Sequence, residues 1–308
     1  MGTGLRIQFS HSSGGGPGVF MKRLKEYLTK HHNIQVVDKN PHLYVSAVWR
    51  GNPPKGVKTI HRVDNCYFDT LRNNMKAYNA SIRKAVQKAD GVIYQSKFSL
   101  GLCKHILGIK GSCRTIIHNG FDQSICNEVV PFEHPYKYLF VTCAIWRPIK
   151  RPKSIIRAFQ KADIPESALI MIGKGIKAPS DPRIICTGSI KLRDIYKYYK
   201  AANAIIHVSR LDACPNTVVE ALSFGKPVVC NNAGGTPEIV ANDGIIATID
   251  PPDSYKTFAM HNADAINVDV LSDAIREVIK RDWHISRPDL NMDICAQQYM
   301  DFFAQVLG

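Results

Sequence analysis

The chain has 308 residues, of which 45% are apolar and 21% charged, a composition that excludes a disordered chain and leaves room for one large domain or two medium ones. No apolar run approaches the roughly 20 residues of a membrane-spanning helix, so we expect a cytoplasmic protein, with peripheral contact to a membrane surface left open. The net charge is +14, and residues 1–135 hold most of it, with 19 Lys and Arg against 8 Asp and Glu, which predicts an anionic partner for this half.

Short apolar strands alternate with helical segments through the first half of the chain. A glycine-rich loop, SSGGGPG, joins the first strand to the first helix. Such alternation is typical of a parallel sheet covered by helices. The predicted strands are Leu5–Ser10, Leu43–Val48, Thr59–Val63, Gly91–Gln95 and Thr115–Ile117, and the predicted helices are Val19–Lys30, Ser81–Ala89 and Ser99–Leu107.

A second series of the same kind follows a break at Glu128–Tyr136, where EVVPFEHPY has no apolar period and reads as a linker. The predicted strands of this series are Lys137–Ile145, Ala168–Ile172, Ile184–Thr187, Ala204–Val208 and Pro227–Cys230, and the helices are Lys153–Lys161, Leu192–Ala201, Asn216–Phe224, Val268–Arg281 and Met292–Val306. The two series predict an α/β protein of two doubly wound, Rossmann-like domains, with ligand bound in the crevice between them at the carboxyl ends of the strands.

The nine cysteines do not form a metal or disulfide pattern. Their number is odd, and no two are spaced as C-x-x-C. Several lie in apolar stretches, such as Cys143 in YLFVTCAIW and Cys230 in KPVVC. We expect free thiols in a reducing compartment and no metal site.

The stretch RLDACPNTVVEALSFGKPVV, Arg210 to Val229, contains two acids around a helix start. Pro215 is a favoured first helical residue, so Asp212 lies in the loop at the end of a strand and Glu220 about one turn inside the helix. The free N–H groups near Asn216, Thr217 and Val218 suit a phosphate. A ligand across this terminus could reach both acids. Alternatively, Asp212 caps the helix and Glu220 faces solvent, and spacing alone leaves both open.

The surrounding residues resemble a known family. DACPNTVVEALSFGKPVV is similar to the E-x7-E segment of retaining nucleotide-sugar glycosyltransferases of family 4, which have the GT-B fold. NNAGGTPEIV, MIGKG, CTGSIKLRDIYKYYKAANAIIHVS, KADGVIYQSKFS and IIHNGFD resemble further segments of that family, in the same order. The resemblance implies a short member with an acceptor-side domain at 1–132, a nucleotide-sugar domain at 133–291, and a last helix, 292–308, that packs back on the first domain.

The resemblance implies that Asp212 binds the sugar hydroxyls of the donor and Glu220 the ribose hydroxyls. Asp212 stands where the family usually has Glu, so the donor sugar or its pose can differ. The family's glycine-rich residues after this acid are replaced by Ala213, Cys214 and Pro215. We expect Cys214 and Pro215 to line the donor together with the helix start. The strand-end turn at Gly173 and the loop after Thr187, Gly188 and Ser189 would contribute to the same site, the latter beside guanine or uracil.

The family's phosphate-binding Arg and Lys follow the first strand of the second domain. The stretch here is AIWRPIKRPK, in which Lys150 occupies the Lys position and Ile145 stands where spacing puts the Arg. We expect Arg147 to take over, with Arg151 in reserve. A leaving diphosphate gains negative charge in the transition state, and fixed cations stabilise that charge without a metal. The alternative is a basic, solvated loop.

Three first-domain residues are further candidates by resemblance. Gly15 and Gly16 lie in the SSGGGPG loop, which would approach the donor diphosphate or the acceptor, and which does not fit the spacing of a dinucleotide fingerprint. TIHRVDN puts His61 near the carboxyl end of a strand, where the family has a His that contacts the donor sugar. Asp64 is an alternative, as an acceptor-side base or as a partner of Arg62. The plain alternative for each is a structural role.

These expectations combine into a metal-independent, retaining glycosyltransferase without a cofactor. Its donor would be a nucleotide sugar, with GDP-mannose favoured over a UDP-sugar, and its acceptor a glycan, glycoprotein or lipid. Two alternatives stay open: a catalytically inactive GT-B module that binds sugar or anions, and a nucleotide-sugar 2-epimerase. A nucleic-acid partner is not expected, because the sequence has no basic-aromatic motif typical of one.

Overall fold

The computed structural model describes residues 4–10, 14–48, 51–68, 74–109, 113–251, 255 and 266–308. The chain divides into two compact units, which we describe separately. The first contains Met1–Gly120, Tyr255–Phe258 and Asp289–Gly308, and the second contains Phe121–Ser254 and Ala259–Pro288. The division falls at Gly120, so the proline-rich stretch at 128–136 belongs to the second unit rather than marking its border.

The first unit is built on a parallel sheet in the order β2-β1-β3-β4-β5-β6. The central strands are buried on both faces, as continuous apolar runs predict, and all five residues of β3 are buried. The strands are β1 (Leu5–Phe9), β2 (Ile34–Val36), β3 (Leu43–Ala47), β4 (Lys58–Val63), β5 (Gly91–Tyr94) and β6 (Cys113–Ile116).

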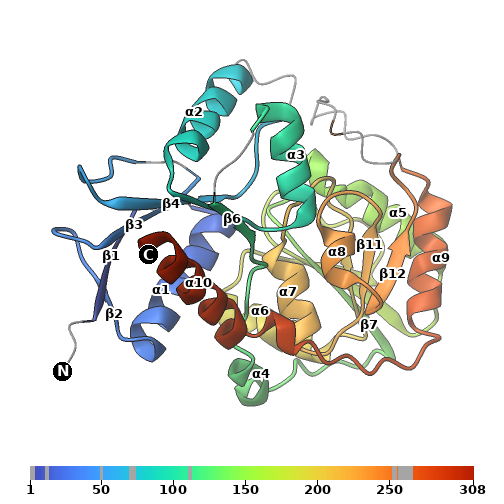
Figure 1. The fold of residues 1–308 in the computed structure, drawn as a ribbon. Helices are drawn as coiled ribbons and strands as arrows, with labels where there is room; N and C mark the ends of the chain where they lie inside the picture. The colour runs from blue at the N-terminus through green and yellow to red at the C-terminus, as the bar shows by residue number, and fades with distance from the viewer. Residues whose placement is uncertain are drawn as a thin grey trace. The chain divides into compact units, whose positions relative to one another are not determined.

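In the part of the first unit that the structure describes, the sheet is covered by helices α1 (Gly16–His31), α2 (Met75–Lys88), α3 (Lys97–Leu107) and α10 (Met292–Leu307). The last helix of the chain lies beside the first, and both bury apolar side chains in one core with strands β1, β3 and β4 (Figure 1). The C-terminal helix is therefore part of the first unit. Helix α3 begins with a capping box between Ser96 and Ser99 and ends at Gly108, whose φ of 61° suits glycine.

The second unit contains another parallel six-stranded sheet, in the order β12-β11-β10-β7-β8-β9. Helices α5 and α9 lie side by side on one face and share a core with β7, β8 and β10 (Figure 1). The strands are β7 (Tyr138–Cys143), β8 (Ser167–Ile172), β9 (Ile184–Gly188), β10 (Ala204–His207), β11 (Val228–Asn231) and β12 (Gly244–Ala247). The helices are α4 (Ser124–Glu128), α5 (Pro152–Ala162), α6 (Leu192–Ala201), α7 (Asn216–Ser223), α8 (Thr236–Val240) and α9 (Val268–Val278), with a short 3-10 turn η1 (Pro148–Lys150). A second 3-10 turn, η3 (Pro288–Leu290), lies where the chain passes from the second unit to the first.

The predicted fold class is confirmed, because both units are parallel sheets covered by helices. Every predicted strand and helix is present, with ends displaced by a few residues. Within the described ranges, the sequence did not predict the short elements β2, α4, α8 and β12 or the 3-10 turns η1 and η3.

Candidate active site

Two loops at the carboxyl end of the second sheet bring the predicted cation and the first acid together. Lys150 closes the turn η1 after β7, and Asp212 follows β10. Lys150 Nζ lies 2.5 Å from Asp212 Oδ2. His207 Nε2, from the last residue of β10, lies 3.1 Å from the same oxygen. The exposed fractions of the three side chains are 17%, 29% and 6% for Lys150, Asp212 and His207.

The electrostatics of this cluster favour an ionised acid beside a neutral imidazole. Burial raises the pKa of Asp212, but Lys150 and His207 outweigh it and hold that pKa far below its usual range. Burial lowers the pKa of His207, and Lys150 lowers it further, against the opposing effect of Asp212. At neutral pH, His207 is therefore a neutral donor to an anionic Asp212.

The backbone of the Asp212 loop is fixed from two sides. Leu211 adopts a φ of 60°, an unusual conformation for a bulky residue. Gly235 N donates to Asp212 O at 2.8 Å, and a Cβ on Gly234 would lie 2.8 Å from that same oxygen. On the other side, Arg210 N donates to Ile149 O at 3.2 Å, which ties the loop to η1. Gly234 is thus needed for the close approach of this turn to the acid.

Asp212 is not a helix cap, contrary to one of the two sequence interpretations. The residue before the first turn of α7 is Pro215, and no side chain caps this helix. Cys214 is buried just before it, and Asn216, Thr217 and Val218 form its first turn. The N–H groups of that turn give the end of α7 a positive partial charge beside the Lys150–Asp212 pair.

Glu220 is buried, with 4% of the residue exposed, so the interpretation that it faces solvent is wrong. Its carboxylate acts on two neighbouring groups. Burial, and after it the charge of Glu220, raise the pKa of Cys143 to about 12. Burial, followed by Cys143 and Glu220, also raises the pKa of Tyr199 well above its ordinary value. Thr217 and Cys143 also influence the pKa of Tyr199, so the ends of β7, α6 and α7 meet close to the acid.

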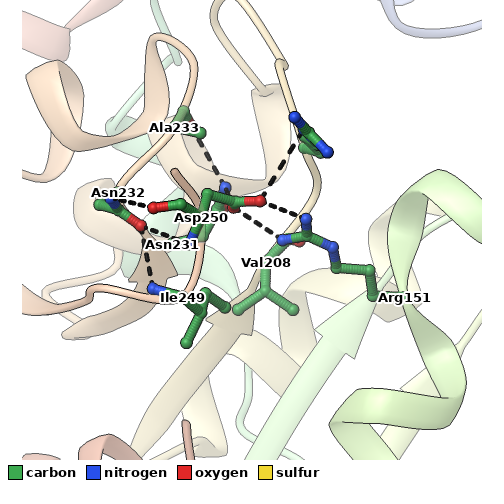
Figure 2. Close-up of polar contacts among 8 residues, drawn as sticks. Arg151, Val208, Asn231, Asn232, Ala233, Ile249 and Asp250 are labelled. Atoms are coloured by element: carbon green, nitrogen blue, oxygen red, sulfur yellow. Dashed lines mark hydrogen bonds and ion pairs between the residues drawn. The ribbon is translucent and has the colours of Figure 1, made fainter. Parts of the chain in front are cut away.

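The two arginines after β7 have different surroundings. Arg147 is exposed at the start of η1, where a phosphate could reach it. The Arg151 side chain is only 1% exposed, and its guanidinium binds both carboxylate oxygens of Asp250 (Figure 2). The reserve role that we predicted for Arg151 is therefore wrong, because its guanidinium is buried and paired with Asp250. Ile145, in the family's Arg position, is 53% exposed.

Asp250 is the centre of a buried polar network (Figure 2). Arg151 Nη1 donates to its Oδ2 at 2.8 Å, and Asn231 Nδ2 donates to the same oxygen at 2.7 Å. Asn232 binds the backbone N and O of Asp250, both at 2.9 Å. Arg151 also donates to Val208 O at 3.4 Å, at the end of β10. Arg151 and Asp250 together thus join the ends of β7, β10, β11 and β12.

The remaining candidates of the second unit line neighbouring turns. Gly173 has a φ of 117°, and a Cβ there would lie 1.9 Å from Ala144 O, so glycine is required where this turn meets the strand leading to η1. Gly173 N donates to Gly188 O at 2.8 Å, which joins the turn to the end of β9. Ser189 follows at an exposed position. The predicted contact of Gly173 and Ser189 with donor stays a prediction.

In the first unit, Gly15 has a φ of 86° and precedes α1, which begins at Gly16, and both are exposed. His61 lies inside β4 rather than at its carboxyl end, is 1% exposed, and its Nδ1 lies 2.8 Å from Ser46 Oγ. β4 ends at Val63, where the predicted strand ends, and the contact of His61 with the donor sugar stays a prediction. Asp64 forms an ion pair with the buried Arg62, one of its two predicted roles.

Within the described ranges, no group of three or more His, Cys, Asp or Glu side chains is arranged to hold a metal ion. Over the same part of the chain, no helix combines the length and apolarity needed to cross a membrane.

Two site residues escaped the sequence analysis, His207 and Asp250. His207 closes the apolar strand AIIH, so a polar residue at a strand end was the available signal. Asp250 is 99 residues from Arg151 in the sequence, and nothing in its own neighbourhood indicates that pairing.

Comparisons with known proteins agree with this geometry. Residues 136–264 match the family described as glycosyl transferases group 1. No curated protein sequence matches the chain. Among solved structures, sucrose-phosphate synthase from Thermosynechococcus elongatus is similar, with 15% identity, 98% of each chain covered and a TM-score of 0.69. Anabaena HepE in complex with UDP has 15% identity, covers 98% of this chain and 100% of its own, and has a TM-score of 0.65.

A third similar structure is AviGT4, a glycosyltransferase involved in avilamycin A biosynthesis, with 15% identity, 98% of each chain covered and a TM-score of 0.60. At this level of identity, these structures establish the fold. Together with the match over 136–264, they lead to one conclusion. The second unit carries a glycosyltransferase group 1 domain, and the chain is a glycosyltransferase of GT-B fold.

Proposed function

We propose that the chain is a retaining, metal-independent glycosyltransferase that moves a sugar from a nucleotide-diphosphate donor to a glycan, glycoprotein or lipid acceptor. The observation that carries this proposal is the Lys150–Asp212 pair beside the uncapped start of α7, at the carboxyl end of the second sheet. Ligands of doubly wound folds bind at this edge. A cation, an acid and a helix start match the charge and hydroxyl groups of a nucleotide sugar.

Each group has a part in the proposed complex. Lys150, with exposed Arg147, binds the diphosphate, and the first turn of α7 adds its N–H groups. Asp212 accepts hydrogen bonds from the sugar, and the buried Glu220 accepts them from the ribose. Because Lys150 already contacts Asp212, the incoming diphosphate shares or takes over its ammonium group.

The proposed reaction needs no nucleophile from the protein. The bond from the anomeric carbon to the diphosphate oxygen breaks, and the acceptor oxygen bonds to the same face of that carbon. The acceptor proton passes to the departing phosphate oxygen, so charge is conserved. Lys150, Arg147 and the helix start stabilise the growing charge of the leaving group.

The donor is proposed at the level of a nucleotide sugar. The sequence favoured GDP-mannose, whereas the HepE structures contain UDP or UDP-glucose. UDP-sugars are therefore the first to test, with GDP-mannose beside them. We further propose a cytoplasmic location, no resident cofactor, no nucleic-acid partner, and an anionic acceptor or membrane surface for the basic half of the chain.

The proposal is tested by a screen of UDP- and GDP-sugars for thermal stabilisation, followed by donor hydrolysis for the wild type, Lys150→Ala and Glu220→Ala. We expect one donor class to stabilise the wild type and both variants to bind it more weakly. Failure to bind any nucleotide sugar would overturn the proposal. Tight binding without turnover on any acceptor would favour the inactive sugar-binding module, and conversion of the donor to its 2-epimer would favour the epimerase.

A further inference from the structure

We propose that His207 is a positioning residue for Asp212: it holds Oδ2 of the carboxylate and directs Oδ1 to a hydroxyl of the donor sugar. The inference rests on the proposed function, because it assumes that Asp212 contacts the sugar. It assigns a role to a side chain that is not itself expected to touch the donor.

His207 is well placed to act as a fixed reference point. It is the last residue of β10, and its backbone is aligned with Cys230 in the neighbouring strand β11. Only 6% of its side chain is exposed. Asp212 lies on the loop five residues further along. Its hydrogen bond with the imidazole therefore ties the carboxylate to the end of a strand in the sheet.

The two oxygens of Asp212 have different surroundings: Oδ2 contacts the protein, and Oδ1 is left for a ligand. His207 Nε2 and Lys150 Nζ both reach Oδ2, at 3.1 and 2.5 Å. Among the residues that the structure describes, no hydrogen bond or ion pair reaches Oδ1. With 29% of the Asp212 side chain exposed, Oδ1 can accept a hydrogen bond from a ligand.

The two partners of Oδ2 differ in whether they would keep their contact with Asp212 once the diphosphate binds. Lys150 carries its charge on a long, flexible side chain, which the donor diphosphate can attract. His207 is buried, and its neutral imidazole is not attracted to the diphosphate in this way. Burial lowers the pKa of His207, so the imidazole is neutral and donates from Nε2 to the carboxylate. When Lys150 turns to the diphosphate, His207 keeps Asp212 oriented.

This arrangement also gives a physical reading of the shorter acid. Asp has one rotatable bond fewer than Glu, so one fixed hydrogen bond is enough to set the direction of its carboxylate. Asp212 therefore extends less far than a Glu would, but its hydrogen bond with His207 gives its carboxylate a defined orientation.

The test measures what the sugar adds to binding. Dissociation constants are determined by calorimetric titration for UDP and UDP-glucose, or for GDP and GDP-mannose if those bind, with the wild type, Asp212→Asn, His207→Leu and His207→Gln. A Gln amide can donate from nearly the position of His Nε2, whereas Leu cannot. We expect His207→Leu to weaken nucleotide-sugar binding about tenfold relative to nucleoside diphosphate, as a lost bond to a charged group does, and His207→Gln to restore most of it.

A double variant separates positioning from a general structural effect. If His207 acts through Asp212, His207→Leu has no further effect on the sugar contribution in the Asp212→Asn background. The inference would be overturned if the losses of sugar binding in the two single variants added up in the double variant. An unchanged sugar contribution in His207→Leu would also overturn it. If His207→Leu does not fold, His207→Asn replaces it, because its amide lies at the Nδ1 position and should fail where Gln succeeds. An effect of Asp212→Asn without any effect at His207 would leave the proposed function intact.

Discussion

Arg151 and Asp250 form an ion pair in which both charged groups are almost fully buried, with side chains 1% and 2% exposed. The pair joins the residue after Lys150 to the segment after β12, and Asn231 and Asn232 complete the hydrogen bonding of Asp250 (Figure 2). Arg151 also has a φ of 54°, which a residue other than glycine adopts only when its surroundings enforce it. The pair thus fixes the backbone next to Lys150.

The first prediction concerns the stability that depends on this pair. Asp250→Ala leaves a buried guanidinium without its anion, so we expect the free energy of unfolding to fall by about 3–5 kcal/mol. The matched control is Asp269→Ala, which breaks an exposed ion pair with Lys161 and should cost less than about 1 kcal/mol. Urea unfolding followed by tryptophan fluorescence measures both, and equal losses would show that Asp250 is not an anchor.

The second prediction concerns the phosphate contact of Lys150. Lys150→Ala should weaken UDP binding about tenfold and UMP binding much less, because the ammonium group is expected at the diphosphate. Lys153→Ala, which removes an exposed lysine three residues further on, is the control and should change neither affinity. A parallel loss for UDP and UMP would argue against a role at the second phosphate.

The third prediction concerns Glu220 and the ribose. If its buried carboxylate accepts hydrogen bonds from the ribose hydroxyls, the wild type binds UDP about tenfold more tightly than the 2′,3′-dideoxy analogue. Glu220→Gln should remove most of that preference. The same variant should lower the pKa of Cys143, because one of the two causes that raise it disappears, while burial keeps it above the ordinary value. The pH dependence of Cys143 alkylation measures this shift.

The fourth prediction concerns acid stability. The pKa of His207 is lowered in the folded protein, so its contribution is lost as pH falls below about 6.5, the value in the unfolded chain. The pKa of Asp212 is also lowered, so its contribution is complete above about pH 4 and is lost below it. His207→Gln should therefore flatten the stability profile between about pH 7 and 5, and Asp212→Asn the profile below about pH 4. Unfolding midpoints at a series of pH values measure both, and identical profiles would contradict the assignment.

The fifth prediction concerns the turn that supports Asp212. Gly234→Ala places a Cβ 2.8 Å from Asp212 O at a φ of 83°, so it should shift the loop and weaken nucleotide-sugar binding. Gly225→Ala is the matched control, because its φ is 69° but the nearest atom to its Cβ is Ile285 O at 3.7 Å. Both lose about 1 kcal/mol of stability from backbone strain, and only the first should lose affinity. Equal affinities would show that Gly234 does not position the acid.

The sequence predicts the fold well where the periodicity is strong. The apolar stripe of α6 predicted its bounds, Leu192–Ala201, because its tyrosines bury one face. Strand β2 was missed because three residues are too few for a period. Helix α8 was missed because its five residues follow a glycine turn and contain a proline. Short elements depend on tertiary packing, which a local pattern does not contain.

The site was predicted in part, for the same reason. Motif spacing predicted Lys150 and Asp212 as site residues, and the structure places them in contact. Spacing could not separate Arg147 from Arg151, because the pairing that buries Arg151 depends on Asp250, far along the chain. The resemblance gave His61 a contact with the donor sugar, whereas the side chain is buried in β4 with Nδ1 2.8 Å from Ser46 Oγ. Burial and long-range pairing decide which polar residues face a ligand.

The central claim is that the second unit holds a nucleotide sugar over Lys150 and Asp212. The most direct measurement is the rate at which the best-binding donor releases its nucleoside diphosphate, for the wild type, Lys150→Ala and Lys153→Ala. We expect Lys150→Ala to lower turnover about 10²–10³-fold, because it removes a fixed charge that stabilises the leaving group, and Lys153→Ala to match the wild type. Equal turnover in all three proteins would contradict the account.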